Sequence, residues 1–343
     1  MSAPPVRCEP VWSDDVSRFV AASPCASWGG SAAFRRACER TLPAWPARVF
    51  VARDGARVRG VLAGYLERRL GGVWFRGMPF GAPAGPWLDA EADRAEVARA
   101  LWAALAAAAR TEGWLGGDVT PWGGGGPGIP PAADLDIGVV RADTASVIDL
   151  AAGPAAWRAS LDNAARRMLS QAARRGVTIE RADGDGLDRV YALYDAQARA
   201  WGLRRVLPAR FYRELLAPPT DAALWVAKRD GEVLCGVLAF VSPRETYAWW
   251  SGSAPAARAV RAFPATLERI AFECGSMQLN LGFSGARDRL VDFKRQLGAR
   301  DVEAGIVDLA PRPRTPYHAL LAWARERARR DRAGRHGAGG EEP

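Results

Sequence analysis

Val49-Phe50-Val51-Ala52-Arg53-Asp54-Gly55, running on to Gly60-Val61-Leu62-Ala63, is the stretch that decides the fold, because the chain repeats it. The second copy is Leu224-Trp225-Val226-Ala227 with Arg229-Asp230-Gly231, running on to Gly236-Val237-Leu238-Ala239. Asp-Gly accepts the positive φ that tight hairpin turns require, so each copy predicts strand, turn, strand. The repeat therefore indicates a duplicated architecture.

Further strand and helix patterns follow each hairpin in a similar order. The expected strands are 73–75, 115–119, 147–150, 246–251 and 277–281, and the expected helices are 91–111, 154–175, 187–200, 208–216, 264–274 and 287–297. This order predicts an α/β fold of two tandem domains, each a mixed, mostly antiparallel sheet flanked by helices. We expect the domains at residues 1–144 and 145–330, with a flexible tail at 331–343.

Length and composition agree with two globular domains. The 343 residues exceed one ordinary core, and 49% hydrophobic with 25% charged residues are globular values. The alanine-rich run from Leu101 to Ala109 is too short to span a membrane, and residues 1–10 lack a secretory pattern. We expect a cytoplasmic protein without a transmembrane segment, and peripheral membrane contact remains open.

Cysteine and histidine content excludes several kinds of site. The five cysteines are scattered without a C-x-x-C pair, which argues against a disulfide framework and against a zinc site. The two histidines, His318 and His336, lie near the C-terminus, away from every candidate site. A Ser-His-Asp or Cys-His mechanism is therefore not expected, nor is a bound metal.

The net charge of +9 and the pI of about 9.8 favour anionic partners such as nucleic acid, nucleotide-linked precursors or lipid headgroups. The same net charge and pI can also arise without an anionic partner. A GC-rich coding sequence favours arginine, and the stretch at 325–335 is basic. Charge alone leaves RNA or nucleotide binding at about even odds.

Four short segments occur in order along residues 40 to 330. They are Pro83-Ala84-Gly85-Pro86-Trp87-Leu88-Asp89, then Asp118-Val119-Thr120-Pro121, then Ile148-Asp149-Leu150 with Arg166, Ala172, Gly176 and Val177, and last Leu281-Gly282-Phe283-Ser284 with Leu290, Phe293-Lys294 and Gly298. Together they resemble the Fem-type family of peptidyltransferases, whose domains are acetyltransferase-like (GNAT-like). The chain departs from the family at Ala84, where arginine is usual, and at Leu297, where an aromatic residue is usual, so the acceptor is in doubt.

The resemblance implies an enzyme that forms an amide bond. It implies transfer of an amino acid from aminoacyl-tRNA, as a co-substrate, to an amine-bearing acceptor such as a peptidoglycan precursor, another nucleotide-linked precursor or a peptide-like metabolite. No tightly bound cofactor is expected. The alternative enzyme uses acetyl-CoA or another acyl-CoA to acylate a sugar, lipid or amino-acid amine. A third possibility is a binding module without activity that recognises tRNA or a nucleotide-sugar.

Lys294 is the first candidate catalytic residue, because Lys228 and Lys294 are the only lysines among 47 basic residues. The resemblance places it in a Phe-Lys motif with Phe293, where its ammonium could neutralise a phosphate or an oxyanion. An exposed helix lysine is the alternative. Asp89 is a candidate acid/base residue, or else caps the next helix.

The candidate substrate-binding residues are mainly arginines and aromatic residues. Arg166 could grip a phosphate or simply pair with Asp162 one turn earlier. Arg204 could reach the site from a helix end. One ring of Trp249-Trp250 is expected in the core and the other beside the substrate. The remaining candidates are Trp250 itself, Ser251, Phe283 and Ser284.

The expected CoA-binding loop lacks its glycines. In acetyltransferases of this fold, backbone N–H groups of a Gly-rich loop hold the pyrophosphate at a helix N-terminus. Here the corresponding stretch is Arg258-Ala259-Val260-Arg261. This absence favours aminoacyl-tRNA over acyl-CoA as the donor.

Overall fold

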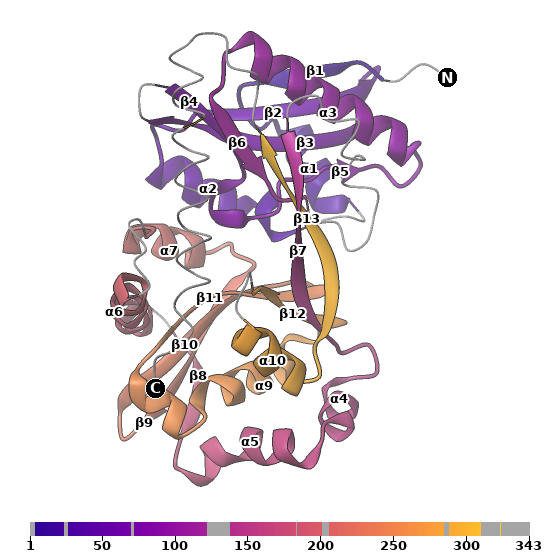
Figure 1. Cartoon of the computed structure of the whole chain (residues 1–343). Helices are drawn as coiled ribbons and strands as arrows, with labels where there is room; N and C mark the ends of the chain where they lie inside the picture. Colours follow the sequence, from indigo (N-terminus) through magenta and orange to yellow (C-terminus); the bar gives the residue numbers. More distant parts are fainter. Residues whose placement is uncertain are drawn as a thin grey trace. The chain divides into compact units, whose positions relative to one another are not determined.

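The computed structural model describes residues 4–23, 27–69, 72–121, 138–182, 184–200, 206–284, 288–309 and 323 (Figure 1). The chain divides into unit 1, residues 1–30, 44–141 and 305–343, and unit 2, residues 31–43 and 142–304. The expected linear division differs from these units in three segments, because 31–43 and 142–144 lie with unit 2 and 305–309 with unit 1. The expected tail at 331–343 lies outside the described residues.

Unit 1 is built on a sheet with the strand order β1-β2-β3-β4-β6-β13. Its elements are β1 (Val6–Glu9), α1 (Asp14–Ala22), η1 (Trp28–Gly30), β2 (Ala47–Asp54), β3 (Arg57–Arg69), β4 (Gly72–Gly77), η2 (Pro79–Gly81), β5 (Trp87–Leu88), α3 (Arg94–Thr111), β6 (Gly116–Val119) and the end of β13 (Arg300–Leu309). All of its strand pairs are antiparallel except β4 with β6. Helix α3 begins at Asp93, whose carboxylate accepts the N–H groups of Ala95 and Glu96.

Unit 2 repeats this plan with the strand order β7-β12-β11-β10-β9-β8. Its elements are α2 (Ala32–Thr41), β7 (Gly138–Asp149), α4 (Pro154–Ser160), α5 (Asn163–Arg174), β8 (Thr178–Arg181), α6 (Gly184–Ala200), α7 (Ala209–Leu216), β9 (Ala222–Arg229), β10 (Glu232–Val241), β11 (Glu245–Ser253), α8 (Pro255–Ala259), α9 (Ala262–Cys274), β12 (Gln278–Phe283) and α10 (Asp288–Gln296). The predicted α/β class with mixed, mostly antiparallel sheets is confirmed.

Helices cover both faces of the unit 2 sheet. A Cβ built on Gly236 of β10 would meet Val190 of α6, whereas the adjacent Val237 packs in a cluster with Ile270 of α9. Because successive strand residues face opposite sides, α6 covers one face of the sheet and α9 the other. This arrangement separates two helical surfaces that carry different side chains.

Both predicted hairpins are present, and their turns differ by one residue in register. In the first, Asp54 still pairs with Arg57, and Gly55 has the positive φ of 58°. In the second, Asp230 and Gly231 both form the turn, with φ of 53° and 82°. The same Asp-Gly dipeptide therefore occurs in two different turns, because glycine has the left-handed backbone in both hairpins.

The single helix expected at 154–175 is wrong in one respect, because the chain breaks between α4 and α5. Leu161 leaves the helix with extended backbone, and the Asp162 carboxylate then accepts the N–H of Ala165 at 2.7 Å as the N-cap of α5. An apolar periodicity that runs through a break cannot reveal it. Asp162 is thus a cap, and Arg166 bonds to Ala159 and Asn163 instead.

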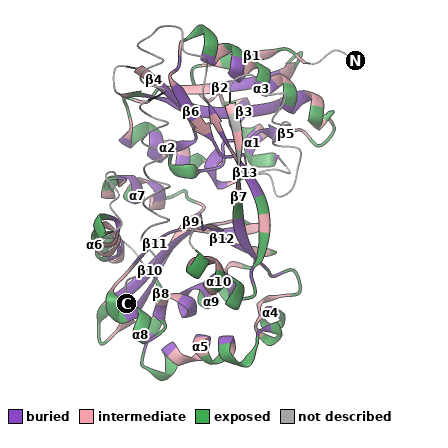
Figure 2. Cartoon of the chain, in the orientation of Figure 1, coloured by how far each residue is buried: buried purple, intermediate pink, exposed green. Residues whose placement is uncertain are grey.

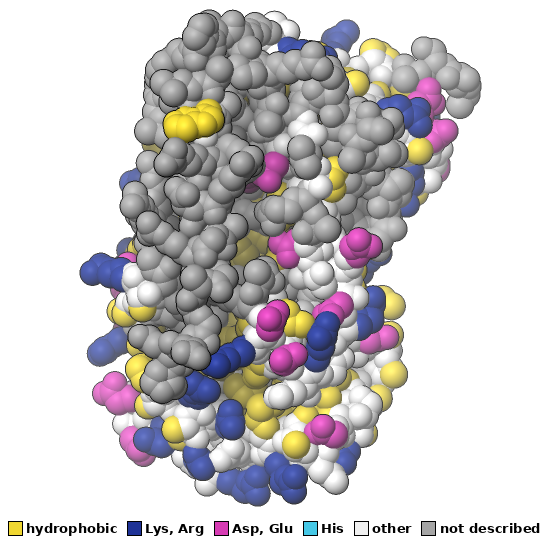
Figure 3. Space-filling model, viewed as in Figure 1, with side chains coloured by type: hydrophobic (Ala, Val, Ile, Leu, Met, Phe, Trp, Pro, Cys, Tyr) yellow, Lys and Arg dark blue, Asp and Glu magenta, His cyan; other side chains and the backbone are white. Residues whose placement is uncertain are grey.

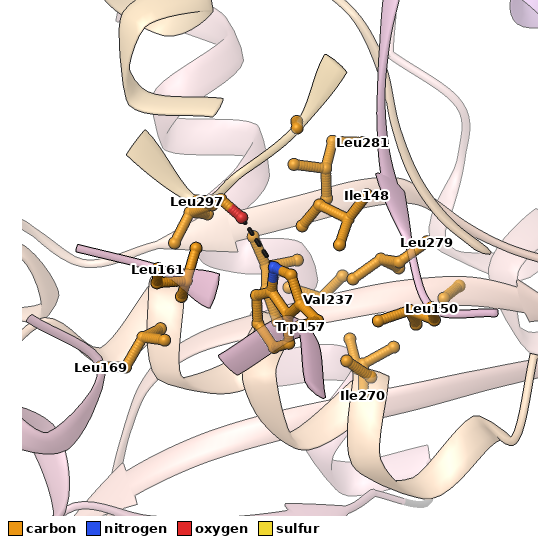
Figure 4. Packing of buried hydrophobic residues seen from close by; sticks show 14 of the residues in the cluster. Ile148, Leu150, Trp157, Leu161, Leu169, Val237, Ile270, Leu279, Leu281 and Leu297 are labelled. Atoms are coloured by element: carbon orange, nitrogen blue, oxygen red, sulfur yellow. Dashed lines mark hydrogen bonds between the residues drawn. The ribbon is translucent and has the colours of Figure 1, made fainter. Parts of the chain in front are cut away.

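The main core of unit 2 lies between α4, α5 and α9 and the sheet (Figure 2). Trp157 lies at its centre, and its indole N–H donates to the Leu297 carbonyl at 2.9 Å (Figure 4). Leu161 and Leu169 flank this ring. Burying a side chain of this size contributes about 1.5–3 kcal/mol each, so this cluster anchors α10 to the rest of the unit.

Candidate functional site

In unit 2 two parallel strands run together and then separate. β11 pairs with β12 only from Glu245 to Tyr247, opposite residues 278–280. Beyond that point β11 continues alongside β10 as far as Ser253, whereas β12 pairs with β7 through Phe283 and Ala145. No strand described here joins β11 to β12 past this point, which we call the unit 2 divergence.

A β-bulge lies in β11 at the unit 2 divergence. Leu238 of β10 pairs with Trp250, and the next residue, Ala239, pairs with Ala248, so Trp249 is the additional residue. Bulges bend a strand, and they re-aim side chains and N–H groups beside functional sites. The bulge therefore alters the direction of the backbone where the two strands part.

Lys294 of α10 lies at the β12 side of the divergence. Its side chain is 4% exposed, and its Nζ donates to the carbonyls of Gly282 at 2.8 Å and Phe283 at 3.2 Å. Burial lowers the pKa of Lys294 to about 8, against the opposing effect of Asp143 and Asp301. The alternative of an exposed helix lysine is wrong. The ammonium has three N–H groups, and these two carbonyls take two of them.

A buried polar chain supports the Gly282 carbonyl. The Glu245 carboxylate accepts hydrogen bonds from the side chains of Gln278 at 2.7 Å and Asn280 at 3.0 Å. The side-chain oxygen of Asn280, Oδ1, accepts the backbone N–H of Gly282 at 2.8 Å. Asn280 is completely buried, and Gly282 has φ of +69°. A Cβ on Gly282 would also lie 2.9 Å from the Tyr247 hydroxyl. These contacts explain why glycine occupies this left-handed position and hold its carbonyl toward Lys294.

Phe283 and Ser284 follow directly at the end of β12. Phe283 is half-buried, and its carbonyl is the second acceptor for Lys294. Ser284 is 7% exposed, and its hydroxyl makes no hydrogen bond within the described residues. Leaving a buried hydroxyl without a hydrogen bond costs about 1–3 kcal/mol. The hydroxyl of Ser284 is therefore available to form a hydrogen bond with a substrate.

On the β11 side, one ring of the Trp249-Trp250 pair lies in the core as expected, and the place of the other beside the substrate stays a prediction. The Trp250 ring is buried and stacks on Tyr212 with centroids 4.3 Å apart. Trp249 is half-buried and contacts Phe34 and Phe211. Both rings therefore belong to the aromatic layer under α2, α6 and α7, and their backbone, with that of half-buried Ser251, borders the divergence.

Of three further predicted residues, Phe293 is next to Lys294, Arg166 lies on α5, and Arg204 is outside the described residues. Phe293 packs against the hydrophobic cluster and contacts Phe263, with ring centroids 6.0 Å apart. Arg166, near the start of α5, is partly exposed and bonded to its own helix region. Arg204 falls in residues 201–205, outside the described part of the chain.

Asp89 lies in unit 1, within a group of arginines. Its carboxylate accepts from Arg59 at 2.8 Å and lies 3.0 Å from Arg57. These arginines and a backbone bond from Glu91 lower the pKa of Asp89 despite its desolvation. A carboxylate with a lowered pKa is a weaker base, and Asp93 rather than Asp89 caps α3. The acid/base role of Asp89 stays a prediction.

The matching place in unit 1 is occupied by the chain itself. β4 and β6 are parallel from Trp74 to Gly77, and residues 83–88 then return beside β3. Ala84 donates its N–H to Thr120 and accepts from Ala63, with Pro83 bridging Thr120. Ala84 and Trp87 are completely buried. In unit 1, segment 83–88 therefore occupies the position where the two parallel strands separate. In unit 2, no described strand occupies the corresponding position.

The start of α9 has the backbone of a glycine-containing loop without glycine. Arg261, the residue before the helix, has φ of 58° and ψ of 35° in the left-handed region. The chain therefore keeps one left-handed residue before this helix although the glycines are missing, and the preference for aminoacyl-tRNA over acyl-CoA stays a prediction. Left-handed arginine costs about 1–2 kcal/mol, which the packing of Val260 and Ala262 in the local core offsets.

Sequence reasoning missed Asn280 and the bulge at Trp249. Asn280 reads as one polar residue inside an apolar strand, Leu279-Asn280-Leu281, and that isolated polar position is the signal that could have found it. A bulge that shifts the register by one residue leaves no comparable trace in the alternation of side chains.

Two other kinds of site are less informative. A surface depression of about 410 Å³ lies between the start of α6 and the β9–β10 turn, with Asp188, Arg189, Lys228 and Glu232 among its lining residues. It contains none of the predicted site residues. Within the described residues, no group of three His, Cys, Asp or Glu side chains is arranged to hold a metal ion.

Comparisons with known proteins agree with this geometry. Residues 156–277 match the family model described as "Acetyltransferase (GNAT) domain". The structure is similar to that of FemX, with a TM-score of 0.66 and 16% identity, covering 92% of this chain and 100% of FemX. A search of curated proteins finds no significant match.

Two more solved structures share the fold. A tandem GNAT protein from the clavulanic acid biosynthesis pathway has a TM-score of 0.55 and 17% identity, over 90% of this chain and 98% of its own. L-PGS from Bacillus licheniformis has a TM-score of 0.54 and 12% identity, over 92% of this chain and 96% of its own. Among the described helices, none has the length and apolar character that crossing a membrane requires.

The duplicated sheet plan, the divergence in unit 2 and these similarities confirm the tandem GNAT-like fold and the resemblance. Residues 156–277 match an acetyltransferase (GNAT) domain, and the fold of the chain is similar to that of FemX and of a tandem GNAT protein.

Proposed function

We propose that this protein transfers an aminoacyl group from aminoacyl-tRNA to the amine of a peptidoglycan precursor or a peptide-like metabolite. The observation that carries the proposal is Lys294, a buried ammonium held by two carbonyls at the end of β12, where β11 and β12 part. The Fem-type resemblance and the net charge of +9 support tRNA as the donor.

The reaction needs little from the protein besides position and charge. The acceptor amine attacks the ester carbonyl, a C–N bond forms, and the bond from carbonyl carbon to the ribose oxygen breaks. The amine proton finally goes to that leaving oxygen. Because the ester is already activated, no protein nucleophile is required, which fits a chain whose two histidines lie near its C-terminus.

Lys294 stabilises the negative charge that develops on the attacked carbonyl oxygen. With a pKa of about 8, it is mostly protonated at neutral pH. Two of its N–H groups are directed to Gly282 and Phe283, which orients the third. A charged donor held in a dry environment acts more strongly on an oxyanion than one in water. The hydroxyl of Ser284 supplies a second hydrogen-bonding group to the substrate at the same strand end.

An acyl-CoA donor is the second candidate. The left-handed backbone of Arg261 is one that a glycine adopts readily, and this feature at the start of α9 supports a phosphate site there. The similar clavulanic acid pathway protein is described in a form without AcCoA, which also favours this alternative. The acceptor in this case is the amine of a sugar, lipid or amino acid.

Two assays run side by side decide between the donors. Purified protein is incubated with candidate acceptors and either total tRNA charged with radiolabelled amino acids or labelled acetyl-CoA. RNase-sensitive transfer from the charged tRNA is the expected result. Transfer only from the thioester would replace the tRNA proposal with the acyl-CoA alternative.

Lys294→Met tests the chemical role. Loss of one preorganised oxyanion donor reduces turnover by about 10²–10³-fold, and Lys294→Arg restores part of it because the charge is kept. Unchanged turnover in Lys294→Met would exclude the proposed role of Lys294. Retained substrate binding without turnover would in turn oppose the binding-module alternative, since the module needs no catalytic lysine.

A further inference from the structure

Exposed arginines gather on one side of unit 2. Arg167, Arg174 and Arg175 lie at α5, and Arg258 and Arg261 lie at the start of α9. All five are exposed, and within the described residues none is within ion-pair distance of a carboxylate. We call this set the α5 arginine surface. Figure 3 shows Lys and Arg side chains gathered where α5 lies in Figure 1.

Several other arginines of unit 2 lie beside carboxylates. On α6 and α7, Arg199 lies 2.5 Å from Asp195, and Arg213 lies 2.6 Å from Asp188. A paired charge produces a weak outward field, whereas clustered unpaired charges of one sign add up. The α5 arginine surface therefore contributes strongly to the field of a chain with net charge +9.

Contacts hold the two segments of this surface together. The Arg175 guanidinium donates to the Ala259 carbonyl, and Ala172 of α5 packs in one cluster with Val260 and Ala262. The two charged segments therefore form one continuous surface.

The arginines on α5 are spaced for an extended anion. Arg167 and Arg174 lie seven residues apart, which places them on one face of the helix at about 10 Å. Arg174 donates to the Arg167 carbonyl at 3.4 Å, so its side chain lies back along that face. The five arginines are divided between two segments and carry more positive charge than one phosphate neutralises, so they suit the successive phosphates of a backbone.

This surface borders the candidate site. Leu161, just before α5, approaches Gly298, just after α10, and Phe263 at the start of α9 contacts Phe293. Lys294 is the next residue after Phe293. The arginines thus extend outward along α5 and α9 from the region where the buried ammonium lies.

We propose that the α5 arginine surface binds the sugar-phosphate backbone of RNA and presents its acceptor end to the Lys294 region. The inference rests on the proposed function, which names the donor but not the surface that holds it. Guanidinium groups bind phosphates bidentately, and the affinity they supply depends on salt and little on base sequence.

Fluorescence anisotropy with end-labelled, uncharged tRNA tests this proposal over a series of salt concentrations. The test variant combines Arg167→Gln, Arg174→Gln and Arg258→Gln. Arg175 and Arg261 are left in place because they hold the local backbone. We expect binding to weaken about 10–100-fold near 0.1 M salt and the slope of log K against log salt to fall by about 2–3.

The control variant combines Arg189→Gln, Arg199→Gln and Arg213→Gln. It removes the same charge from exposed positions of α6 and α7, and α6 covers the other face of the sheet. We expect its affinity for tRNA to change less than about 3-fold. Thermal unfolding of both variants checks that each is folded.

The outcomes separate this surface from the proposed function. Equal weakening in both variants means general charge attraction and overturns the surface, as does full affinity in the test variant. Displacement of tRNA by micromolar CoA overturns it too, because the arginines would then take a mononucleotide. A loss of tRNA affinity in the test variant alone supports the α5 arginine surface as the RNA-binding surface. This holds even if charged tRNA gives no aminoacyl transfer, because that result would reject only the proposal that aminoacyl-tRNA is the donor.

Discussion

The two units end their parallel strand pairs in opposite ways. In unit 1, β4 and β6 part, and residues 83–88 return between β3 and Thr120 with completely buried side chains at Ala84 and Trp87. In unit 2, β11 and β12 part, and no described strand takes the place. A duplicated fold can therefore keep one set of strands, fill the position between them in one copy and leave it for the proposed chemistry in the other.

The same contrast explains a departure from the Fem-type motif. Ala84 stands where arginine is usual, and here it is completely buried between two hydrogen-bonded strands. An arginine at this point would need room and a counter-charge that the described neighbours do not supply. The motif loop of this chain thus serves packing within unit 1.

Each unit also holds a cation near its parallel strands, and the largest expected effect comes from the one in unit 1. Arg76 of β4 donates to buried Glu67 at 2.9 Å and to Asp118. Arg76→Met leaves the Glu67 carboxylate buried without that partner, so we expect the free energy of unfolding to fall by about 3–5 kcal/mol. Urea denaturation measures this change.

Turnover per folded molecule distinguishes the two cations. It stays within about 3-fold of the wild type in Arg76→Met, because the filled position in unit 1 takes no part in transfer. A loss as deep as that of Lys294→Met, at full folding, would contradict the assignment of chemistry to unit 2.

Two glycines sharpen the contrast between a filled and a functional position. Gly85 has φ of +90°, and a Cβ there would lie 2.8 Å from the Val61 carbonyl oxygen. We expect Gly85→Ala to cost about 2–4 kcal/mol of stability with little change in rate per folded molecule. Gly282→Ala, with φ of +69°, costs about 1–2 kcal/mol but also turns the carbonyl that accepts Lys294.

Chemical denaturation and transfer assays on both glycine variants measure the two effects separately. The rate should fall more in Gly282→Ala, and the stability more in Gly85→Ala. The reverse order would mean that the strand end of β12 is a packing element like segment 83–88.

The buried ammonium gives unit 2 a characteristic pH response. The pKa of Lys294 is about 8 in the folded protein against 10.5 for an ordinary lysine. Between these values the unfolded state binds more protons, so the free energy of unfolding rises with pH, by at most about 3 kcal/mol from this group. Below pH 8 both states are protonated and the contribution of Lys294 no longer changes.

Unfolding curves from pH 7 to 10.5 measure this rise as the difference between the wild type and Lys294→Met, which cancels the other titrating groups. Turnover should also fall above pH about 8 as the ammonium is lost. Lys294→Arg keeps its charge and moves this fall to higher pH. A rate that rises through pH 8 because of Lys294 would instead identify its neutral amine as a base.

The smallest effect concerns the unbonded hydroxyl. Ser284→Ala removes a buried polar atom that has no partner within the described residues. We expect the free energy of unfolding to increase by about 1 kcal/mol and the transfer rate to fall less than about 10-fold. Calorimetry and steady-state kinetics on one preparation measure both, and a loss of stability would show that the hydroxyl is bonded in the free protein.

The parts of the fold with local causes were predictable from sequence. The Asp-Gly hairpins, the helix after residue 91 and most strands follow from turn chemistry and side-chain periodicity, whereas β1, β8 and β13 were not predicted. The break at Leu161–Asp162 was missed because apolar spacing continues across it. The position of α2 was also missed, since nothing local shows that Phe34 packs against Phe211 and Trp249.

The candidate site was predictable only in part. Scarcity of lysine and the Phe-Lys motif singled out Lys294, and the Gly-Phe-Ser segment marked the strand end beside it. The burial of Lys294, the support from Asn280 and the left-handed Arg261 required coordinates, because each depends on groups distant in sequence. The pairing of Arg166 with the Asp162 side chain was wrong, because Asp162 caps α5, and a binding role for Arg166 stays a prediction.

The sequence by itself determined the duplicated hairpins, the α/β class and a lysine in a recognisable motif, because these follow from residues that are neighbours along the chain. Only the tertiary structure decided that segment 83–88 fills the strand divergence of unit 1, and that in unit 2 the ammonium of Lys294 lies buried against the end of β12. The physical reason is that strand pairing and desolvation depend on contacts between segments that are distant in the sequence. The residues of one local segment do not specify those contacts.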